Sequence, residues 1–392
     1  MRLRVYRLVG KVLTPLVVTS GLGYRGFVHV PRRELIPGSV IKGALLTQLL
    51  REGLASAETV NNLALSPDFA VTPMLAADRE GRILLHDLLI SHALCAYSKW
   101  RLGDGGRSLG RPLMSPGLHE VINVLRRGAD LKRALEEVLR RFADKLCDSG
   151  KLYLQAGEVK SAQGVPVAEL SGMWWTVTVR TSSYVEVALD HARGAAAPEM
   201  LYAYEYVRPG TLYSGLVAVL ESSPLLELLK RRRFTLSVGR GVSRGFGKLL
   251  IVADEVKLPE LGSLRNDDYV AFVALSPIFV LSPLPTPPQR RLSLEEEWYR
   301  TFLGEGIKLK LRIIGALGSG ISYSGWSLRT RKPKLTVRGL GEGGILLCKV
   351  EIGQIENAAL LTVLGLDHFA SAGFNQVIPL FEDPFSRWEP WK

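Results

Sequence analysis

Glycines and basic residues alternate in one short stretch of the sequence, residues 239–247, in a pattern that suits an anion. Four glycines within nine residues let the backbone adopt positive φ and approach a ligand closely. Fixed positive charge stands between and just after these glycines. The candidate phosphate-contacting residues of this stretch are Gly239, Arg240, Gly241, Ser243, Arg244, Gly245 and Lys248.

Two familiar nucleotide-binding motifs do not fit this glycine loop. A P-loop requires Gly-Lys-Ser/Thr after an earlier glycine, but Leu249 follows Lys248 and Val242 stands where the earlier glycine should be. A dinucleotide fingerprint requires the glycines to open a helix, whereas a strand is expected over 248–253. What remains is a glycine hairpin with arginines, suited to a polynucleotide backbone. The alternative is a tight turn with solvated arginines.

A Pro-Gly-Ser turn at residues 37–39 precedes an apolar stretch with helical spacing, in which Ile41, Ala44, Leu45 and Leu49 share one face. The start of a helix offers unpaired N–H groups and the positive end of its dipole to an anion. Lys42 opposes that dipole, which becomes favourable if an anion lies between them. The candidate anion site comprises Gly38, Ser39 and Lys42, with Ser39 as N-cap, and Arg25, Arg32 and Arg33 of the preceding loop are weaker candidates. The alternative is an ordinary capped helix with an exposed lysine.

The composition agrees with a partner that carries phosphate. The chain has 392 residues and 50 Lys plus Arg against 38 Asp plus Glu, a formal charge of +12. A basic surface attracts polyanions, although a surface rich in ion pairs gives the same total. Three widely spaced cysteines, no apolar run long enough for a membrane helix and no apolar leader predict a cytoplasmic protein without a disulfide framework.

The elements expected along the chain predict an α+β protein. Strands are expected over 3–9, 12–18, 174–189, 234–238 and 248–253, and helices over 121–127, 131–145 and 224–232. The polar stretch 254–267 marks a domain boundary. Beyond it, Leu13-Thr14-Pro15-Leu16-Val17-Val18 returns as Leu275-Ser276-Pro277-Ile278-Phe279-Val280, and a second glycine turn follows at 372–377. A weak internal duplication explains this repeat.

Other chemistry-bearing residues are interpreted as structural. His92 and Cys95, with His86 upstream, lack the paired Cys-x-x-Cys spacing of a zinc site, and a buried cysteine beside a surface histidine is expected. Tyr202, Tyr204 and Tyr206 alternate on a strand, where one face is usually core and base stacking is the alternative. No metal or other cofactor is predicted.

The two basic motifs together resemble a known family. Ile36-Pro37-Gly38-Ser39-Val40-Ile41-Lys42-Gly43-Ala44-Leu45 is similar to the IPGSxxKGxLR segment of the RAMP superfamily of CRISPR-associated proteins, although Leu46 stands where an arginine is frequent. The glycine loop resembles the loop that precedes the last strand of that family's RRM-like domain. Residues 188–211 resemble a third family segment. Residues 324–334 and 341–344 resemble the second domain of two-domain type III subunits.

The resemblance implies binding of CRISPR RNA (crRNA) within a type III ribonucleoprotein. Target-cutting backbone subunits use an aspartate before the Pro-Gly-Ser turn, but residues 20–36 contain only Glu34 as an acid. The processing endoribonuclease of the family uses His, Tyr and Lys for acid–base chemistry, and Tyr24, His29 and Lys42 provide such a set. The large subunit that holds the 5′ tag of the guide, especially of type III-D-like complexes, is the best match.

The sequence therefore predicts two RRM-like (ferredoxin-like) domains, 1–257 and 266–392, with a helical insertion at about 75–150 in the first. The expected function is non-catalytic binding of the crRNA 5′ tag. The expected partners are the guide, the backbone RAMP subunits and the large signature subunit of the complex, with no membrane. The alternative is a metal-independent endoribonuclease that processes repeat RNA.

Overall fold

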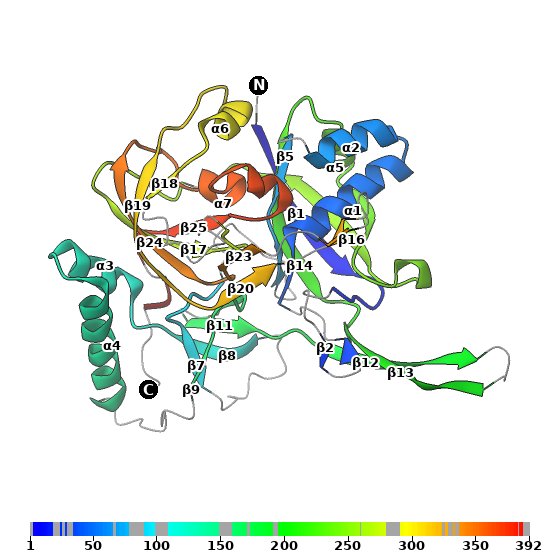
Figure 1. The fold of residues 1–392 in the computed structure, drawn as a ribbon, viewed down its shortest axis with the longest axis horizontal. Helices are drawn as coiled ribbons and strands as arrows, with labels where there is room; N and C mark the ends of the chain where they lie inside the picture. The colour runs from blue at the N-terminus through cyan, green and yellow to red at the C-terminus, as the bar shows by residue number, and fades with distance from the viewer. Residues whose placement is uncertain are drawn as a thin grey trace.

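The chain folds into several β-sheets with helices packed around them (Figure 1). The computed structural model describes residues 3–18, 24–25, 28–29, 34–65, 68–77, 90–98, 109–148, 159–170, 173–190, 195–258, 260–279, 291–323, 326–327, 332–333, 337–382 and 384–386. The structure is of the mixed α/β kind that the sequence predicts. Within these residues, no helix is long and apolar enough to span a membrane.

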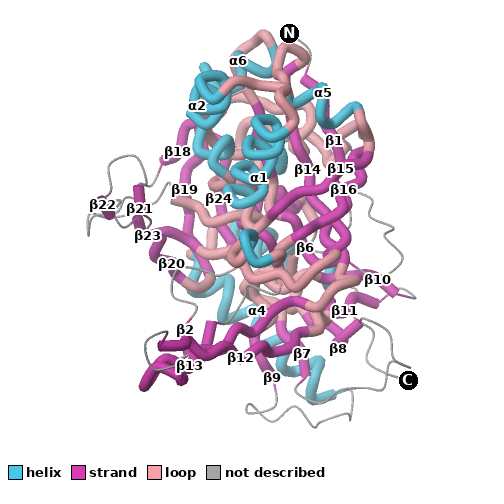
Figure 2. The backbone as a smooth tube through the Cα atoms, turned by 90° about the vertical axis from the view of Figure 1, so that its right-hand side faces the viewer, coloured by secondary structure: helices cyan, strands magenta, loops and turns pink. Residues whose placement is uncertain are grey.

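A seven-stranded sheet is built mainly from the first half of the chain, in the order β15-β16-β1-β14-β6-β4, with β5 also paired to β14. Its strands are β1 (Leu3–Val12), β4 (Leu35–Ile36), β5 (Phe69–Val71), β6 (Met74–Ala77), β14 (Leu212–Leu220), β15 (Arg233–Ser237) and β16 (Lys248–Glu255). The helices that accompany it are α1 (Gly38–Arg51), α2 (Ala57–Leu65) and α5 (Leu225–Lys230). Figure 2 shows α1 lying over these strands. The strand prediction for 12–18 is wrong, because the sheet ends at Val12 and the chain breaks at Thr14-Pro15.

Both faces of this sheet are buried, which explains the nearly continuous apolar sequence of β14. Val217 and Val219 pack with the helices α1 and α5, whereas Leu216 and Ala218 pack with residues of the C-terminal half. Successive residues of a strand point to opposite faces, so an alternating polar pattern would have left one face unsuited to burial. The two halves of the chain thus share one of the two large hydrophobic cores.

The C-terminal half forms a five-stranded sheet in the order β18-β19-β24-β17-β25. Its elements are β17 (Tyr269–Ala274), β18 (Arg291–Ser293), α6 (Glu296–Leu303), β19 (Lys310–Leu317), β24 (Ile345–Ile352), α7 (Leu360–Leu364), the 3₁₀ turn η3 (His368–Ala372) and β25 (Val377–Leu380). Two small ribbons pair β20 (Gly320–Tyr323) with β23 (Val337–Leu340), and β21 (Trp326–Ser327) with β22 (Lys332–Pro333). Trp298 and Tyr299 of α6 are buried, and both donate hydrogen bonds to the chain at the end of α7.

The described residues of the segment predicted as a helical insertion, about 75–150, form strands as well as helices. Helices α3 (Leu118–Arg126) and α4 (Leu131–Asp148) match the predicted ones, and α3 contacts β17 of the C-terminal half. A second five-stranded sheet accompanies them: β7 (Ala96–Ser98), β8 (Leu109–Met114), β9 (Val159–Ser161), β10 (Val167–Leu170) and β11 (Met173–Val177). The strand predicted over 174–189 is two strands, because the chain leaves β11 at Val177 and enters β12 at Thr181.

A long hairpin projects from the body of the molecule (Figure 1). It is formed by β12 (Thr181–Asp190) and β13 (Ala195–Val207). Two short strands, β2 (Tyr24–Arg25) and β3 (Val28–His29), extend the sheet, and β3 runs parallel to β13. This small sheet lies beside the loop between β15 and β16, because Arg244 of that loop donates to the hydroxyl of Tyr204 on β13.

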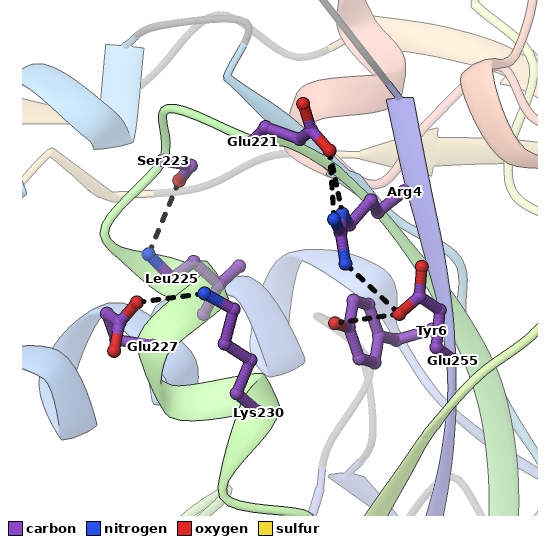
Figure 3. A network of polar contacts seen from close by, with 8 residues as sticks. All are labelled: Arg4, Tyr6, Glu221, Ser223, Leu225, Glu227, Lys230 and Glu255. Atoms are coloured by element: carbon purple, nitrogen blue, oxygen red, sulfur yellow. Dashed lines mark hydrogen bonds and ion pairs between the residues drawn. The ribbon is translucent and has the colours of Figure 1, made fainter.

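Surface ion pairs join the ends of neighbouring strands in the large sheet (Figure 3). The guanidinium of Arg4 on β1 donates to Glu221, just after β14, at 3.0 Å, and to Glu255 at the end of β16 at 3.3 Å. Exposed pairs of this kind contribute little to stability, because water screens both charges. Their importance here is that part of the basic charge is matched by carboxylates away from any binding loop.

The start of α1 is covered by the C-terminal half of the chain. Gly373, just after η3, has a φ of +81°, and its Cα lies 3.1 Å from where a Cβ of Gly38 would stand. A Cβ on Gly373 would in turn lie 2.7 Å from the carbonyl carbon of Gly38. Only two glycines allow these backbones to approach so closely. The Pro-Gly-Ser turn is therefore a contact between the two halves.

We expect Gly373→Ala to lower the free energy of unfolding by about 2–4 kcal/mol, because it adds a steric overlap to left-handed backbone strain. Gly304→Ala is the matched control. Gly304 has the same φ of +81°, but a Cβ there meets nothing within 4 Å. This control should cost about 1–2 kcal/mol. Urea unfolding of the two variants measures the difference, and equal losses would contradict the close contact.

Candidate nucleic-acid interface

All four glycines of the loop between β15 and β16 adopt left-handed backbone conformations. Their φ angles are +83° at Gly239, +75° at Gly241, +86° at Gly245 and +72° at Gly247. Gly241 and Gly245 flank a single 3₁₀ turn, η2 (Val242–Arg244). Side chains other than glycine rarely adopt this conformation, so the positive φ predicted for these glycines is confirmed.

The base of the loop is attached to the segment that follows β1. The N–H of Gly247 donates to the carbonyl of Pro15 at 2.8 Å, and the N–H of Lys248 donates to the hydroxyl of Thr14 at 3.0 Å. The N–H of Arg240 donates to the carbonyl of Val17 at 2.8 Å. Both ends of the loop are therefore positioned by the Thr-Pro segment, a role that the sequence pattern does not predict.

The second half of the chain makes the same hydrogen bonds. The N–H of Asn375 donates to the carbonyl of Pro277, and the N–H of Gln376 donates to the hydroxyl of Ser276, both at 3.0 Å. Asn375 has a φ of 54°, so it occupies the left-handed conformation that Gly247 has in the first half. The predicted repeat thus has a structural counterpart in each half. In the second half, however, the turn is closed, because Asn375 and Gln376 are buried.

The tip of the first loop is open and carries its charge on the surface. Arg240, Ser243, Arg244 and Lys248 are exposed. The guanidinium of Arg244 lies over two aromatic rings, 5.2 Å from the ring centre of Tyr204 and 5.8 Å from that of Phe246. It also donates to the Tyr204 hydroxyl at 3.3 Å. The loop therefore presents several exposed cations, and neighbouring aromatic groups orient that of Arg244.

Two of the three residues of the second predicted anion site are buried, and Ser39 is half-buried. Gly38 is buried at the contact with Gly373, and Lys42 keeps only 5% of its surface exposed. The N-cap position belongs to Pro37, and no side chain caps the helix, so the assignment of Ser39 as N-cap is wrong. The predicted apolar face is confirmed, since Ile41, Ala44, Leu45 and Leu49 are all buried. Burial of Lys42 contradicts the alternative of an exposed lysine, whereas the anion site at the helix start stays a prediction.

Lys42 lies against the core of the first sheet. Its ammonium group is 5.0 Å from the ring centre of Phe69, and no described residue accepts a hydrogen bond from it. Burial lowers the pKa of Lys42 to about 8, against a smaller opposing effect of Asp68. A buried ammonium without a hydrogen-bond partner destabilises the fold relative to an apolar side chain.

The remaining predicted site residues lie on the small sheet or outside the described residues. Tyr24 and His29 are paired across β2 and β3, and His29 is aligned with Tyr204 of β13. Arg25 lies on β2, and Arg32 and Arg33 lie outside the described residues. Because Lys42 is buried in the core between α1 and the large sheet, it does not complete a solvent-accessible set with Tyr24 and His29.

Two of the three residues weighed as zinc ligands are part of the core, and the third, His86, lies outside the described residues. His92 and Cys95 are both buried, and the ring of His92 lies 5.4 Å from that of Phe385. The expectation of a surface histidine is therefore wrong. In the part of the chain that the structure describes, no group of three or more His, Cys, Asp or Glu residues could hold a metal ion.

The family can now be assigned from the sequence that builds this interface. A sequence profile of the RAMP superfamily matches residues 10–250, well over half of the chain. The chain belongs to the RAMP superfamily. The matched region of this RAMP protein includes α1, the long hairpin and the whole glycine loop, whereas residues 251–392 lie beyond it.

Comparison with other proteins gives distant structural likenesses. No curated protein matches the chain in sequence. A chain of the type III-B Cmr-beta complex bound to cognate target RNA is 13% identical, with a TM-score of 0.43 over 87% of this chain and 86% of that chain. A chain of the Csm3–Csm4 subcomplex of the type III-A CRISPR-Cas interference complex is 11% identical, with a TM-score of 0.34 over 96% and 98%. Oligomeric Cmr4 from Pyrococcus furiosus is 13% identical, with a TM-score of 0.27 over 65% and 99%.

We expect Lys42→Met to stabilise this RAMP protein at pH 7 by roughly 2 kcal/mol, because it replaces a buried charged side chain with an uncharged one of similar shape. Between pH 8 and 10.5 the unfolded chain keeps the lysine proton that the folded chain has lost. Wild-type stability therefore rises with pH across this window, and below pH 8 the cost of burying the charge is fully present. The advantage of the variant should shrink from pH 8 to 10.5.

Thermal unfolding of both proteins across that pH range measures the effect. Retained affinity of the variant for RNA is the second readout, since Lys42 is closed to solvent. A loss of RNA affinity without loss of stability would show that Lys42 reaches a ligand after all.

Proposed function

We propose that this RAMP protein is a non-catalytic, crRNA-binding subunit of a type III CRISPR ribonucleoprotein. It holds the guide, chiefly its 5′ tag, and docks on the backbone RAMP subunits and the large signature subunit. The observation that carries this proposal is the open glycine loop with its exposed arginines, Arg240 and Arg244, fixed between two strands of the sheet. Exposed guanidinium groups on one short glycine-rich loop suit the phosphates of a polynucleotide.

The strand order supports two RRM-like domains. In the first half, counting β1, β5, β14 and β16 as strands one to four, the first strand lies between the fourth and the third, and the second lies outside the third. The strands β17, β19, β24 and β25 follow the same order in the second half. In each half, helices follow the first and third strands, which is the ferredoxin-like β-α-β-β-α-β pattern. We place the domains at 1–257 and 266–392.

We assign RNA binding to the glycine loop of the first half and not to the corresponding turn of the second half. The turn at 373–376 corresponds to the glycine loop by its hydrogen bonds, but it is packed against the start of α1. It also carries no arginine. The proposed guide-binding surface therefore lies on the first domain, around Arg240, Ser243, Arg244 and Lys248, with the intervening glycines Gly239, Gly241 and Gly245.

We expect Arg244→Glu to weaken binding of a guide RNA by 10-fold or more, because it replaces an oriented cation with a repelling anion. Arg140→Glu is the matched control, since it changes the net charge equally at an exposed position of α4. Filter binding with guides that carry or lack the 5′ tag measures the affinity and the preference for the tag. Affinity should also fall steeply with salt. Equal effects of the two variants, or affinity that is flat with salt, would count against the loop.

The alternative function is cleavage of repeat RNA without a metal. The backbone pairing of Tyr24 with His29 brings two of its three residues into register, whereas burial of Lys42 removes the third from solvent. We therefore expect no site-specific product when the purified protein is incubated with repeat RNA in EDTA. Cleavage that disappears in His29→Ala would overturn the non-catalytic assignment.

A further inference from the structure

An exposed tyrosine stands at the edge of the glycine loop without a role in phosphate binding. Tyr184 of β12 keeps 49% of its surface exposed. It lies directly opposite Tyr204 in the register of β12 and β13, so both rings are on the same face of the hairpin. The ring of Phe246 meets that of Tyr184 edge to face, with 6.2 Å between centroids and an interplanar angle of 83°. Loop and hairpin are thus joined through aromatic contacts.

The loop glycines create this contact. The N–H of Phe246 donates to the carbonyl of Gly241 at 3.1 Å, which folds the loop back on itself. A Cβ on Gly241 would lie 2.9 Å from the Phe246 ring, so glycine leaves the space that this ring occupies. Phe246 in turn lies beneath the Arg244 guanidinium and beside Tyr184. Arg244 and Tyr184 therefore both contact the ring of Phe246.

We propose that Tyr184 is a stacking platform for an unpaired base of the bound RNA, and that Arg244 binds the phosphate next to that base. This inference rests on the proposed function and names the residue that contacts a base rather than the backbone. Single-stranded nucleic acid is commonly bound by a basic groove with aromatic side chains on which bases stack. Tyr184 is the ring of this cluster that suits the role, because the ring of Tyr204 is covered by the Arg244 guanidinium.

The charge around the ring favours RNA over an apolar protein segment as the occupant. Arg244 and Arg240 are exposed on the adjoining loop, and Lys248 follows. A base offers a flat π face to the ring and a phosphate to the arginine on the same ligand. Because every base has such a face, the platform should tolerate any sequence at this position.

The test uses the full chain and a single-stranded RNA of roughly 16 nucleotides, the upper end of the site size of one binding module. The RNA carries 2-aminopurine at successive positions, so that stacking is seen as quenching of its fluorescence. The variants are Tyr184→Ala, Tyr184→Leu and Tyr184→Phe. Val185→Ala is the matched control, because Val185 is the next residue of β12, is 58% exposed and points to the opposite face.

We expect Tyr184→Ala and Tyr184→Leu to weaken RNA binding roughly 5- to 100-fold and to abolish the quenching, whereas Tyr184→Phe and Val185→Ala keep both. The salt dependence should be unchanged in the Tyr184 variants, because no phosphate contact is lost, and affinity for heparin should be unaffected. Tyr184→Leu keeps an apolar side chain against Phe246, so it separates loss of the π face from loss of packing.

The outcomes separate this inference from the proposed function. If Tyr184→Ala and Tyr184→Leu bind and quench like the wild type while Arg244→Glu loses affinity, the platform is overturned and guide binding stands. If Arg244→Glu also binds normally, the proposed function fails as well. If the Tyr184 variants bind RNA normally but no longer assemble with neighbouring subunits, the ring is a protein-docking surface and the platform is overturned.

Discussion

Each half of the molecule is organised by two hydrogen bonds to a Thr-Pro or Ser-Pro dipeptide, Thr14-Pro15 in the first half and Ser276-Pro277 in the second. A proline has no N–H to donate, so the first strand cannot continue through it, and its carbonyl remains available for another segment. In both halves that carbonyl accepts a bond from a residue with positive φ, and the preceding hydroxyl accepts one from the next residue. This brings the chain into the last strand beside the first. The sheet order, the position of the glycine turn and hence the candidate RNA contacts all follow from that constraint.

The two copies of this arrangement differ in what their turns contact. In the first half, the glycine loop is long enough to form an extra 3₁₀ turn and reaches solvent. In the second half, the side-chain amide of Asn375 makes two kinds of hydrogen bond. Its Nδ2 donates to the Asp367 carboxylate, and its Oδ1 accepts from the N–H of Phe279 at 2.8 Å, so the turn packs inside the protein. Burial raises the pKa of Asp367, and the Asn375 hydrogen bonds offset part of that effect. The closed turn then packs on the start of α1, which joins the two halves.

Local patterns in the sequence predicted much of this fold, and contacts between distant residues account for the errors. The strands around the glycine loop, the amphipathic helices α3 and α4, and the repeat depend on neighbouring residues, and they are as expected. The closed helix start at Gly38 depends on Gly373, which follows it by more than three hundred residues, and no local pattern contains that information. The contact between Tyr184 and Phe246 is also beyond a local pattern, because it requires both the register of β12 with β13 and the folded loop.

The net charge of +12 is a poor guide to the site by itself, because the structure distributes it unevenly. Arg4, Arg7, Arg231 and Arg300 form ion pairs with carboxylates on the surface, where such pairs contribute little to stability but reduce the field that an approaching polyanion meets. Arg244 lies over two aromatic rings, which restrict the orientations that its guanidinium can take. A guanidinium that is already oriented loses less conformational freedom when it binds a phosphate. The aromatic support of Arg244 is therefore a better guide to the binding loop than the net charge of the chain.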